Sequence, residues 1–224
     1  MLAPNLKWKR LLIVDDDEIT RLLVRRMASD IGLSRIEEAV DGSQAAKRVI
    51  ETQPDLVLCD IQMEPLDGLS FLKDVRTGNA DMPRDLHVIM FSGLTENPYY
   101  GTALALDADG FLPKPVDKHT LEKRFIRCFN DIRPIRDVEA YQVIPIPGRD
   151  HIAGAPPSAD GSSAALGGTK RAISELTPGD VLARDLCMTD GSLLLIAGME
   201  ITKSLIARIS DLDEMNEIKY VYVE

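Results

Sequence analysis

The sequence predicts an α/β fold, with a doubly wound five-stranded parallel sheet followed by a small C-terminal β-rich α+β module. Short apolar runs alternate with amphipathic stretches from residue 10 to residue 132, a pattern typical of repeated strand-helix units. The composition then changes, and a second apolar pattern begins near Arg171. Because 224 residues exceed one domain of ordinary size, one domain with a smaller partner fits the length.

The first domain is predicted over residues 8–132, where five short apolar runs are each followed by a segment with helical periodicity. The expected strands are Leu11–Val14, Arg35–Val40, Leu56–Cys59, His87–Phe91 and Gly110–Leu112. The expected helices lie near residues 18–31, 42–52, 68–77, 98–107 and 117–132.

Residues 133–170 are predicted to be a linker, because proline, glycine, serine and alanine dominate and large apolar residues are scarce. The module over residues 171–224 is marginal in size for independent folding, so we expect it either to dimerise or to dock on the first domain. This module should begin with a turn at Thr177–Asp180, followed by strands at Val181–Thr189 and Ser192–Ile196 that a hairpin turn at Asp190–Gly191 joins. A helix capped by Thr202 should follow, with Leu205, Ile206, Ile209 and Leu212 on one face. A strand at Ile218–Val223 should complete the module.

Charge and composition exclude several classes of protein. A net charge of -10 and a pI near 4.9 argue against wrapping nucleic acid or lying on an anionic membrane. Neither a cleavable signal segment nor an apolar run of membrane-spanning length is found, so we expect a cytoplasmic protein that makes no contact with nucleic acid or membrane. The three cysteines lack zinc-site spacing and indicate reduced thiols.

Acidic residues follow two of the predicted strands. Asp15 and Asp16 come directly after the first strand, and Asp60 comes directly after the third. Because the carboxyl ends of neighbouring parallel strands form the ligand crevice of a doubly wound sheet, these carboxylates should converge. Close like charges require a cation, and an oxygen-only cluster suits Mg²⁺. The sequence therefore predicts a magnesium site formed by Asp15, Asp16 and Asp60.

The same edge of the sheet should carry two hydrogen-bond donors. Ser92 ends the fourth strand and Lys114 ends the fifth. With Mg²⁺ bound, Asp60 is placed to attack phosphorus as a nucleophile, and Ser92 and Lys114 are placed to hold the phosphoryl oxygens. Proline after Lys114 makes a cis peptide bond one of two alternatives at that position.

The segments LLIVDDDE, LVLCDIQMEPLDG, VIMFSG and GFLPKP resemble the CheY-like receiver domain of bacterial two-component response regulators. The resemblance implies a flavodoxin-like fold and phosphorylation of Asp60 by a histidine kinase or a histidine phosphotransfer protein. It also implies a metal-binding backbone carbonyl at Gln62, a phosphoryl-sensing pair of Ser92 and Lys114, and an aromatic switch at Phe111 that turns inward when Ser92 moves toward the phosphoryl group.

Two positions bear on the lifetime of the phosphorylated state. The family usually carries proline four residues after the acceptor, whereas Glu64 occupies that place here and proline follows at position 65. Gln62 stands where the family's side chain influences dephosphorylation. An added carboxylate can slow either phosphotransfer or dephosphorylation, so the sequence does not assign this lifetime.

The C-terminal segments AISELTPGDVLARDL, TDGSLLLIAG and ITKSLIARI resemble the small β-rich module that accompanies HD-GYP phosphodiesterases. The sequence contains neither an HD pair nor a GYP motif, so we expect no catalytic output and a protein that is not an enzyme beyond its own phosphorylation and autodephosphorylation.

We therefore expect a response regulator that switches protein–protein interactions, with a downstream protein partner and with homodimerisation as one option. A phosphorylation-independent scaffold is the alternative, which the complete set of five site residues disfavours. A transcription regulator is disfavoured by the tail, because residues 170–224 hold six Lys/Arg against ten Asp/Glu, a net charge of about -4.

Overall fold

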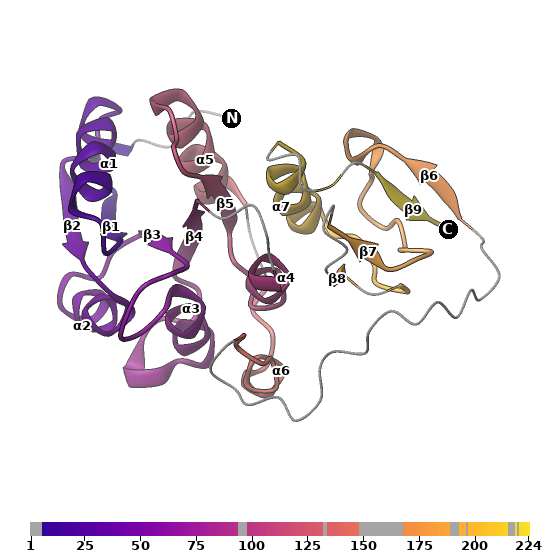
Figure 1. Cartoon of the computed structure of the whole chain (residues 1–224), viewed down its shortest axis with the longest axis horizontal. Coiled ribbons are helices and arrows are strands. Elements are labelled where there is room, and N and C mark those ends of the chain that lie inside the picture. The colour runs from indigo at the N-terminus through magenta and orange to yellow at the C-terminus, as the bar shows by residue number, and fades with distance from the viewer. Residues whose placement is uncertain are drawn as a thin grey trace. The chain divides into compact units, whose positions relative to one another are not determined.

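The computed structural model describes residues 6–93, 98–131, 134–147, 168–188, 193–195, 197–214, 218 and 220–224. The chain divides into two compact units (Figure 1). The first contains the five-stranded sheet, and the second contains two small antiparallel sheets near the C-terminus. No helix in the described part of the chain is long and apolar enough to span a membrane.

The first unit is built on a parallel sheet with the strand order β2-β1-β3-β4-β5, which confirms the predicted doubly wound fold. The strands are β1 Arg10–Val14, β2 Arg35–Ala39, β3 Leu56–Asp60, β4 His87–Ser92 and β5 Gly110–Pro113. The helices are α1 Glu18–Asp30, α2 Gly42–Thr52, α3 Gly68–Thr77, α5 Lys118–Asn130 and α6 Val138–Gln142, with short 3₁₀ turns at Leu6–Trp8 and Asn79–Asp81. Helix α4, Pro98–Ala105, is divided between the two units, because its residues 98–102 belong to the second.

The sheet forms the centre of this unit because its inner strands are apolar on both faces. Every residue of β3 is buried, as expected for a parallel strand covered on both sides. Helices α1 and α5 pack together over one face, where Val24, Leu121 and Phe125 join the apolar core. Helices α2 and α3 lie on the opposite side (Figure 1). The carboxyl ends of the strands are thereby held in fixed positions.

The helix ends differ from the predicted ones by one or two residues where the backbone departs from helical geometry. Helix α4 was predicted to reach residue 107 but ends at Ala105. Asp107 has a φ of 54°, a left-handed conformation that cannot continue an α-helix. Helix α5 begins at Lys118, because Asp117 is extended and caps the helix by accepting from the amides of His119 and Thr120.

A further short helix lies in the segment 133–170, which was predicted to be a linker. Helix α6 at Val138–Gln142 packs against α3, and its Tyr141 is fully buried. The linker pattern did not predict this helix, because one aromatic residue among polar neighbours gives no helical periodicity. Residues 148–167 of the predicted linker, and the predicted domain boundary at residues 132–133, lie outside the described residues.

The second unit is small and rich in short strands. Strand β6, Thr169–Arg171, pairs with β9, Val221–Val223, and β7, Leu186–Cys187, pairs with β8, Leu193–Leu195. Helix α7, Lys203–Glu214, buries Leu205, Ile209 and Leu212. Isolated bridges at Val181 and Leu182 complete the pairing.

Several predicted details of this unit are observed. Thr202 caps α7, because its hydroxyl accepts from the amide of Leu205 at 3.2 Å. Thr177–Asp180 forms a turn in which the Asp180 carboxylate accepts from the amide of Thr177 at 2.8 Å. The strand predicted over Val181–Thr189 is shorter, with pairing confined to two segments of it, and a 3₁₀ turn forms at Ile173–Glu175. The predicted hairpin turn at Asp190–Gly191 lies outside the described residues.

Candidate functional site

Three carboxylates meet at the carboxyl edge of the parallel sheet. Asp15 and Asp16 follow the last residue of β1, and Asp60 is the last residue of the neighbouring strand β3. One oxygen from each carboxylate lies within 4.8 Å of the others. The structure therefore brings together the three acids that the sequence placed at neighbouring strand ends.

Two of these acids are buried, which fixes their orientation. Asp15 is fully buried, and its Oδ1 accepts from the amide of Asp17 at 3.0 Å. Asp60 is 7% exposed, and its Oδ1 accepts from the amide of Gln62 at 3.3 Å. Asp16 is exposed at the rim. The cluster thus opens toward solvent on the Asp16 side.

Lys114, directly after β5, brings a positive charge to the acids. Its Nζ lies 2.6 Å from Oδ2 of Asp15 and 2.8 Å from Oδ2 of Asp60. Burial alone would lower the pKa of Lys114, but the two carboxylates outweigh burial and raise that pKa. The Lys114–Pro115 peptide bond is cis, and the amide of Lys114 donates to the carbonyl of Ser92 at 2.8 Å. The lysine is therefore charged and held at the site.

Asp60 carries a raised pKa. Burial is the main cause, and the charge of Asp15 adds to it, while Lys114 acts in the opposite direction. Among the described residues, Oδ2 of Asp15 makes its ion pair with Lys114 but accepts no hydrogen bond of regular geometry. A buried carboxylate beside two other acids fits a site for a hard divalent cation. The acids and the lysine together can hold a cation and an anionic group.

The remaining predicted site residues lie on strands of the same sheet or in a loop that follows one of them. Ser92 is the last residue of β4 and is 2% exposed. Phe111 lies on β5 opposite Met90 of β4 and is fully buried. Gln62 and Glu64 follow β3 with exposed side chains. Every residue that the sequence nominated for the site therefore lies on β1, β3, β4 or β5 or in the loop that follows one of them.

Comparison with known proteins agrees with this arrangement. The model of the response regulator receiver domain family matches residues 11–126, about half of the chain. The chain belongs to this family. The match ends within α5, so it leaves α6 and the C-terminal residues 145–224 outside the matched receiver domain.

Individual relatives cover the receiver domain and little else. The chemotaxis protein CheY of Bacillus subtilis is 32% identical over 106 residues, covering 47% of this chain and 85% of CheY. A protein-glutamate methylesterase/protein-glutamine glutaminase of Nocardioides sp. is 36% identical over 111 residues, covering 48% of this chain and 29% of that enzyme. This chain spans about a third or less of the length of such methylesterase relatives.

A solved structure has the same fold. A putative response regulator from Chloroflexus aurantiacus superposes with a TM-score of 0.50 at 22% identity, covering 55% of this chain and 98% of that protein. At 22% identity this likeness supports the shared fold alone.

Asp17 has a different role from Asp15 and Asp16, because it caps a helix. Its carboxylate caps α1, accepting from the amides of Ile19 at 3.3 Å and Thr20 at 2.9 Å. The hydrogen bonds from Thr20 lower the pKa of Asp17. Of the three consecutive acids, the structure therefore assigns the third to the helix start.

Gly68 allows α3 to begin against the backbone of the acceptor strand, a requirement that the sequence analysis missed. Its amide donates to the carbonyl of Ile61 at 3.0 Å. A Cβ atom at position 68 would lie 1.9 Å from the carbonyl oxygen of Asp60. A lone glycine at a helix start gives no signal of this close approach, which depends on tertiary packing.

A second group of potential ligands lies at the opposite edge of the receiver sheet. His87, Asp109 and Cys128 bring one ligand atom each within 4.8 Å of the others, although they are far apart in sequence. Oδ2 of Asp109 is engaged by Arg76 at 2.9 Å and by the amide of Val88 at 2.8 Å. Arg76 and Asp109 are both almost completely buried, so this carboxylate is the counter-ion of a buried arginine.

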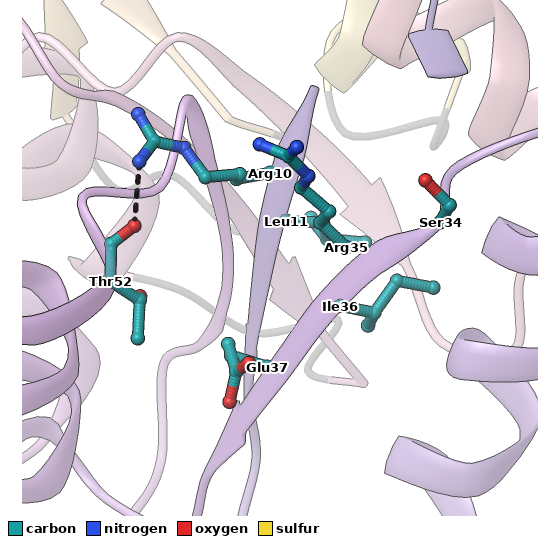
Figure 2. A pocket seen from close by; sticks show the side chains of 7 residues that line it. All are labelled: Arg10, Leu11, Ser34, Arg35, Ile36, Glu37 and Thr52. Atoms are coloured by element: carbon teal, nitrogen blue, oxygen red, sulfur yellow. Dashed lines mark hydrogen bonds between the residues drawn. The ribbon is translucent and has the colours of Figure 1, made fainter. Parts of the chain in front are cut away.

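A pocket of about 340 Å³ also lies at this opposite edge, beside the starts of β1 and β2 (Figure 2). Arg10 lines it but donates to the carbonyl of Thr52 at 2.9 Å and pairs with Asp55. The pocket is thus separate from the carboxylates, which lie at the other ends of the same strands. The remaining lining residues are Leu11, Ser34, Arg35, Ile36, Glu37 and Thr52.

Proposed function

We propose that the receiver domain accepts a phosphoryl group on Asp60 in a two-component phosphorelay and uses it to switch protein–protein interactions. The observation that carries this proposal is the convergence of three carboxylates and the Lys114 ammonium at one sheet edge. Membership of the receiver family and the likeness to CheY support it.

Mg²⁺ is the cofactor of this proposal. Asp15, Asp16, Asp60 and the backbone carbonyl of Gln62 would hold it, because oxygen ligands suit a hard cation. When bound, the ion neutralises charge on the carboxylates and on the phosphoryl oxygens. Asp15 supports this role because its carboxylate is fully buried beside the other two acids.

The chemistry at Asp60 is a displacement at phosphorus. An oxygen of the Asp60 carboxylate forms a bond to phosphorus, and the bond from phosphorus to the donor breaks, with its electron pair leaving on the donor. Lys114 lies 2.8 Å from Asp60, so its ammonium group can pair with an oxygen of the phosphoryl group once that group is attached. Ser92 is placed to donate a hydrogen bond to another phosphoryl oxygen. Phe111 is the proposed switch, and the structure holds it buried.

The proposed donor is a histidine kinase or a histidine phosphotransfer protein, and the proposed target is a downstream protein reached through the receiver and the second unit. Residues 171–224 resemble the module that accompanies HD-GYP proteins, and the acidic composition of this segment favours a protein partner or a second copy of this chain over nucleic acid. The methylesterase activity named for some relatives is not carried over, because the aligned region covers only the receiver part of the chain.

The test is to incubate the purified chain with acetyl phosphate and Mg²⁺ and to follow intact mass together with size-exclusion elution. Wild-type protein should gain one phosphoryl group only when Mg²⁺ is present, and Asp60→Asn should gain none. A change of elution on phosphorylation would identify homodimerisation or a rearrangement of the units. Absence of any gain would favour the phosphorylation-independent scaffold instead.

A further inference from the structure

Residues 134–144 follow the receiver domain and lie docked on it; we call this segment the strap. Helix α6 of the strap packs against α3, and Lys73 of α3 donates from Nζ to the carbonyl of Ile144 at 2.7 Å. The strap is therefore packed against the first unit of the chain. The strap itself lies outside the residues 11–126 that match the receiver family.

Tyr141 is the anchor of the strap. It is fully buried, and its hydroxyl donates to Oδ2 of Asp107 at 3.0 Å while accepting from the amide of Arg136 at 3.1 Å. Nε of Arg136 donates to the same oxygen of Asp107 at 2.9 Å. The guanidinium groups of Arg136 and Arg84 lie 4.6 and 5.9 Å from the centre of the Tyr141 ring. One buried aromatic residue thus joins several charged groups.

The strap is fastened to the corner between α4 and β5. Asp107 stands in this corner with left-handed backbone geometry. Arg136 also donates to the carbonyl of Ala105, the last residue of α4. Arg76 of α3 holds the same corner by donating to the carbonyl of Asp107 at 2.9 Å. The strap therefore contacts the backbone at the end of α4 and the side chain that precedes β5.

This corner is connected to the proposed phosphorylation site through one short strand. Strand β5 has four residues, from Gly110 to Pro113, and joins the corner directly to Lys114, which contacts Asp60. The switch residue Phe111 is the second residue of this strand. In the present structure the buried position of Phe111 and the docked strap occur together. Because coupling needs an element with two arrangements that both sites influence, Phe111 and the corner are suited to that role.

We propose that the strap is a phosphorylation-dependent latch, in which the Tyr141–Asp107–Arg136 contacts form with Phe111 inward and loosen with Phe111 outward. This inference rests on the proposed function, because phosphorylation at Asp60 is what favours the inward position. The ligand of the latch is the chain itself, since residues 134–144 are the occupant of the corner.

The latch would control how far the C-terminal residues 168–224 can move from the receiver domain. When docked, the strap is removed from the connection between them; when released, it adds residues 134–144 to that connection. Extended chain spans at most about 3.6 Å per residue, so release lengthens the connection by up to about 40 Å. Phosphorylation would thereby raise the effective concentration of residues 168–224 near the receiver domain.

Hydrogen exchange measured by mass spectrometry on the full chain tests this latch. Acetyl phosphate and Mg²⁺ should slow exchange in peptides covering residues 134–144 by at least about 5-fold, the lower end of typical allosteric couplings. Asp60→Asn should show no such change. Intact mass is recorded on the same samples, so a failure of phosphorylation is distinguished from a failure of the latch.

Tyr141→Phe removes the hydroxyl and keeps the ring, and it should speed strap exchange in both states and abolish the difference between them. Tyr220→Phe is the matched control, because Tyr220 is 44% exposed in the second unit. Unchanged or faster strap exchange in wild-type protein that carries the phosphoryl group would overturn the latch, as would a Tyr141→Phe variant that keeps the full response.

Discussion

The ammonium group of Lys114 lies 2.8 Å from a carboxylate oxygen of Asp60, although the two residues are 54 positions apart in the chain. The same ammonium group lies 2.6 Å from Asp15. The sheet creates this proximity, because β5, β3 and β1 all end at one edge. In the receiver site, the positive charge of Lys114 therefore partly compensates the negative charges of the two buried acids.

Lys114→Met should destabilise the Mg²⁺-free protein, because it leaves two buried like charges uncompensated. Breaking a buried ion pair lowers the free energy of unfolding by about 3–5 kcal/mol. Because Lys114 is partly exposed, we expect the loss to lie at or below the lower end of this range. Urea unfolding with and without Mg²⁺ measures the effect, and Mg²⁺ should restore more stability in the variant than in wild-type protein. Lys118→Met, at an exposed position of α5, is the control. Equal stability of both variants would contradict the charge balance.

Asp60→Asn should stabilise the Mg²⁺-free protein at neutral pH. The pKa of Asp60 is raised above its ordinary value of 3.8 by burial and by Asp15, so the folded state binds this proton more tightly than the unfolded state. The stability associated with Asp60 is fully present below pH 3.8 and is lost as pH rises through the raised pKa.

The asparagine carries no such penalty, and Lys114 keeps Asp15 as its partner. We expect a gain on the order of 1 kcal/mol at pH 7 from denaturant unfolding, with the difference shrinking toward acidic pH. A difference that grows as the pH falls would show the opposite sign of the pKa shift.

Asp16 and Asp17 are adjacent and exposed but should respond differently to substitution. Asp16→Ala should weaken Mg²⁺ binding measured by isothermal titration, because the carboxylate belongs to the cluster. Asp17→Ala should leave Mg²⁺ affinity unchanged and lower the melting temperature, because it removes the cap of α1. Since hydrogen bonds lower the pKa of Asp17, its stabilising effect is present above the ordinary pKa of 3.8 and is lost as pH falls through the lowered value. A loss of affinity confined to Asp17→Ala would reverse the assignment.

Gly68→Ala should disturb the acceptor strand. The added methyl group would meet the carbonyl oxygen of Asp60 at 1.9 Å, so either α3 or Asp60 must move. Overpacking of this kind costs about 1–3 kcal/mol, and the rate of phosphorylation should fall with it. At Gly93 the nearest atom would lie 3.8 Å away, so Gly93→Ala is the matched control. Comparable unfolding midpoints for the two alanine variants would show that Gly68 has no such requirement.

The main sheet and its acidic edge could be predicted from sequence because their signals are local. The inner strands β1, β3 and β4 are short apolar runs, and their burial leaves few alternative structures. Asp60 follows such a run directly, and Asp15 follows another, so the order of the elements places both at one edge. Strand ends shifted by one residue, as at Arg10 and Ser92, because pairing extends slightly beyond the apolar run.

The features that were not predicted depend on contacts between distant residues. Arg76 and Asp109 form a buried ion pair, but each alone resembles a surface residue in the sequence. Tyr141 lies in a segment with the composition of a linker, and its burial depends on Asp107 and Arg136. Gly68 is required by a backbone approach that only the packed fold contains. Periodicity carries no information about such partners.

Locating the phosphoryl group in the chain decides whether Asp60 is the residue that accepts it. After treatment with acetyl phosphate and Mg²⁺, borohydride reduction converts an aspartyl phosphate to homoserine, which peptide mass spectrometry places in the sequence. We predict homoserine at position 60, dependent on Mg²⁺ and absent from Asp60→Asn. Homoserine at another aspartate, or a phosphoryl group that persists in the Asp60→Asn variant, would show that Asp60 is not the acceptor.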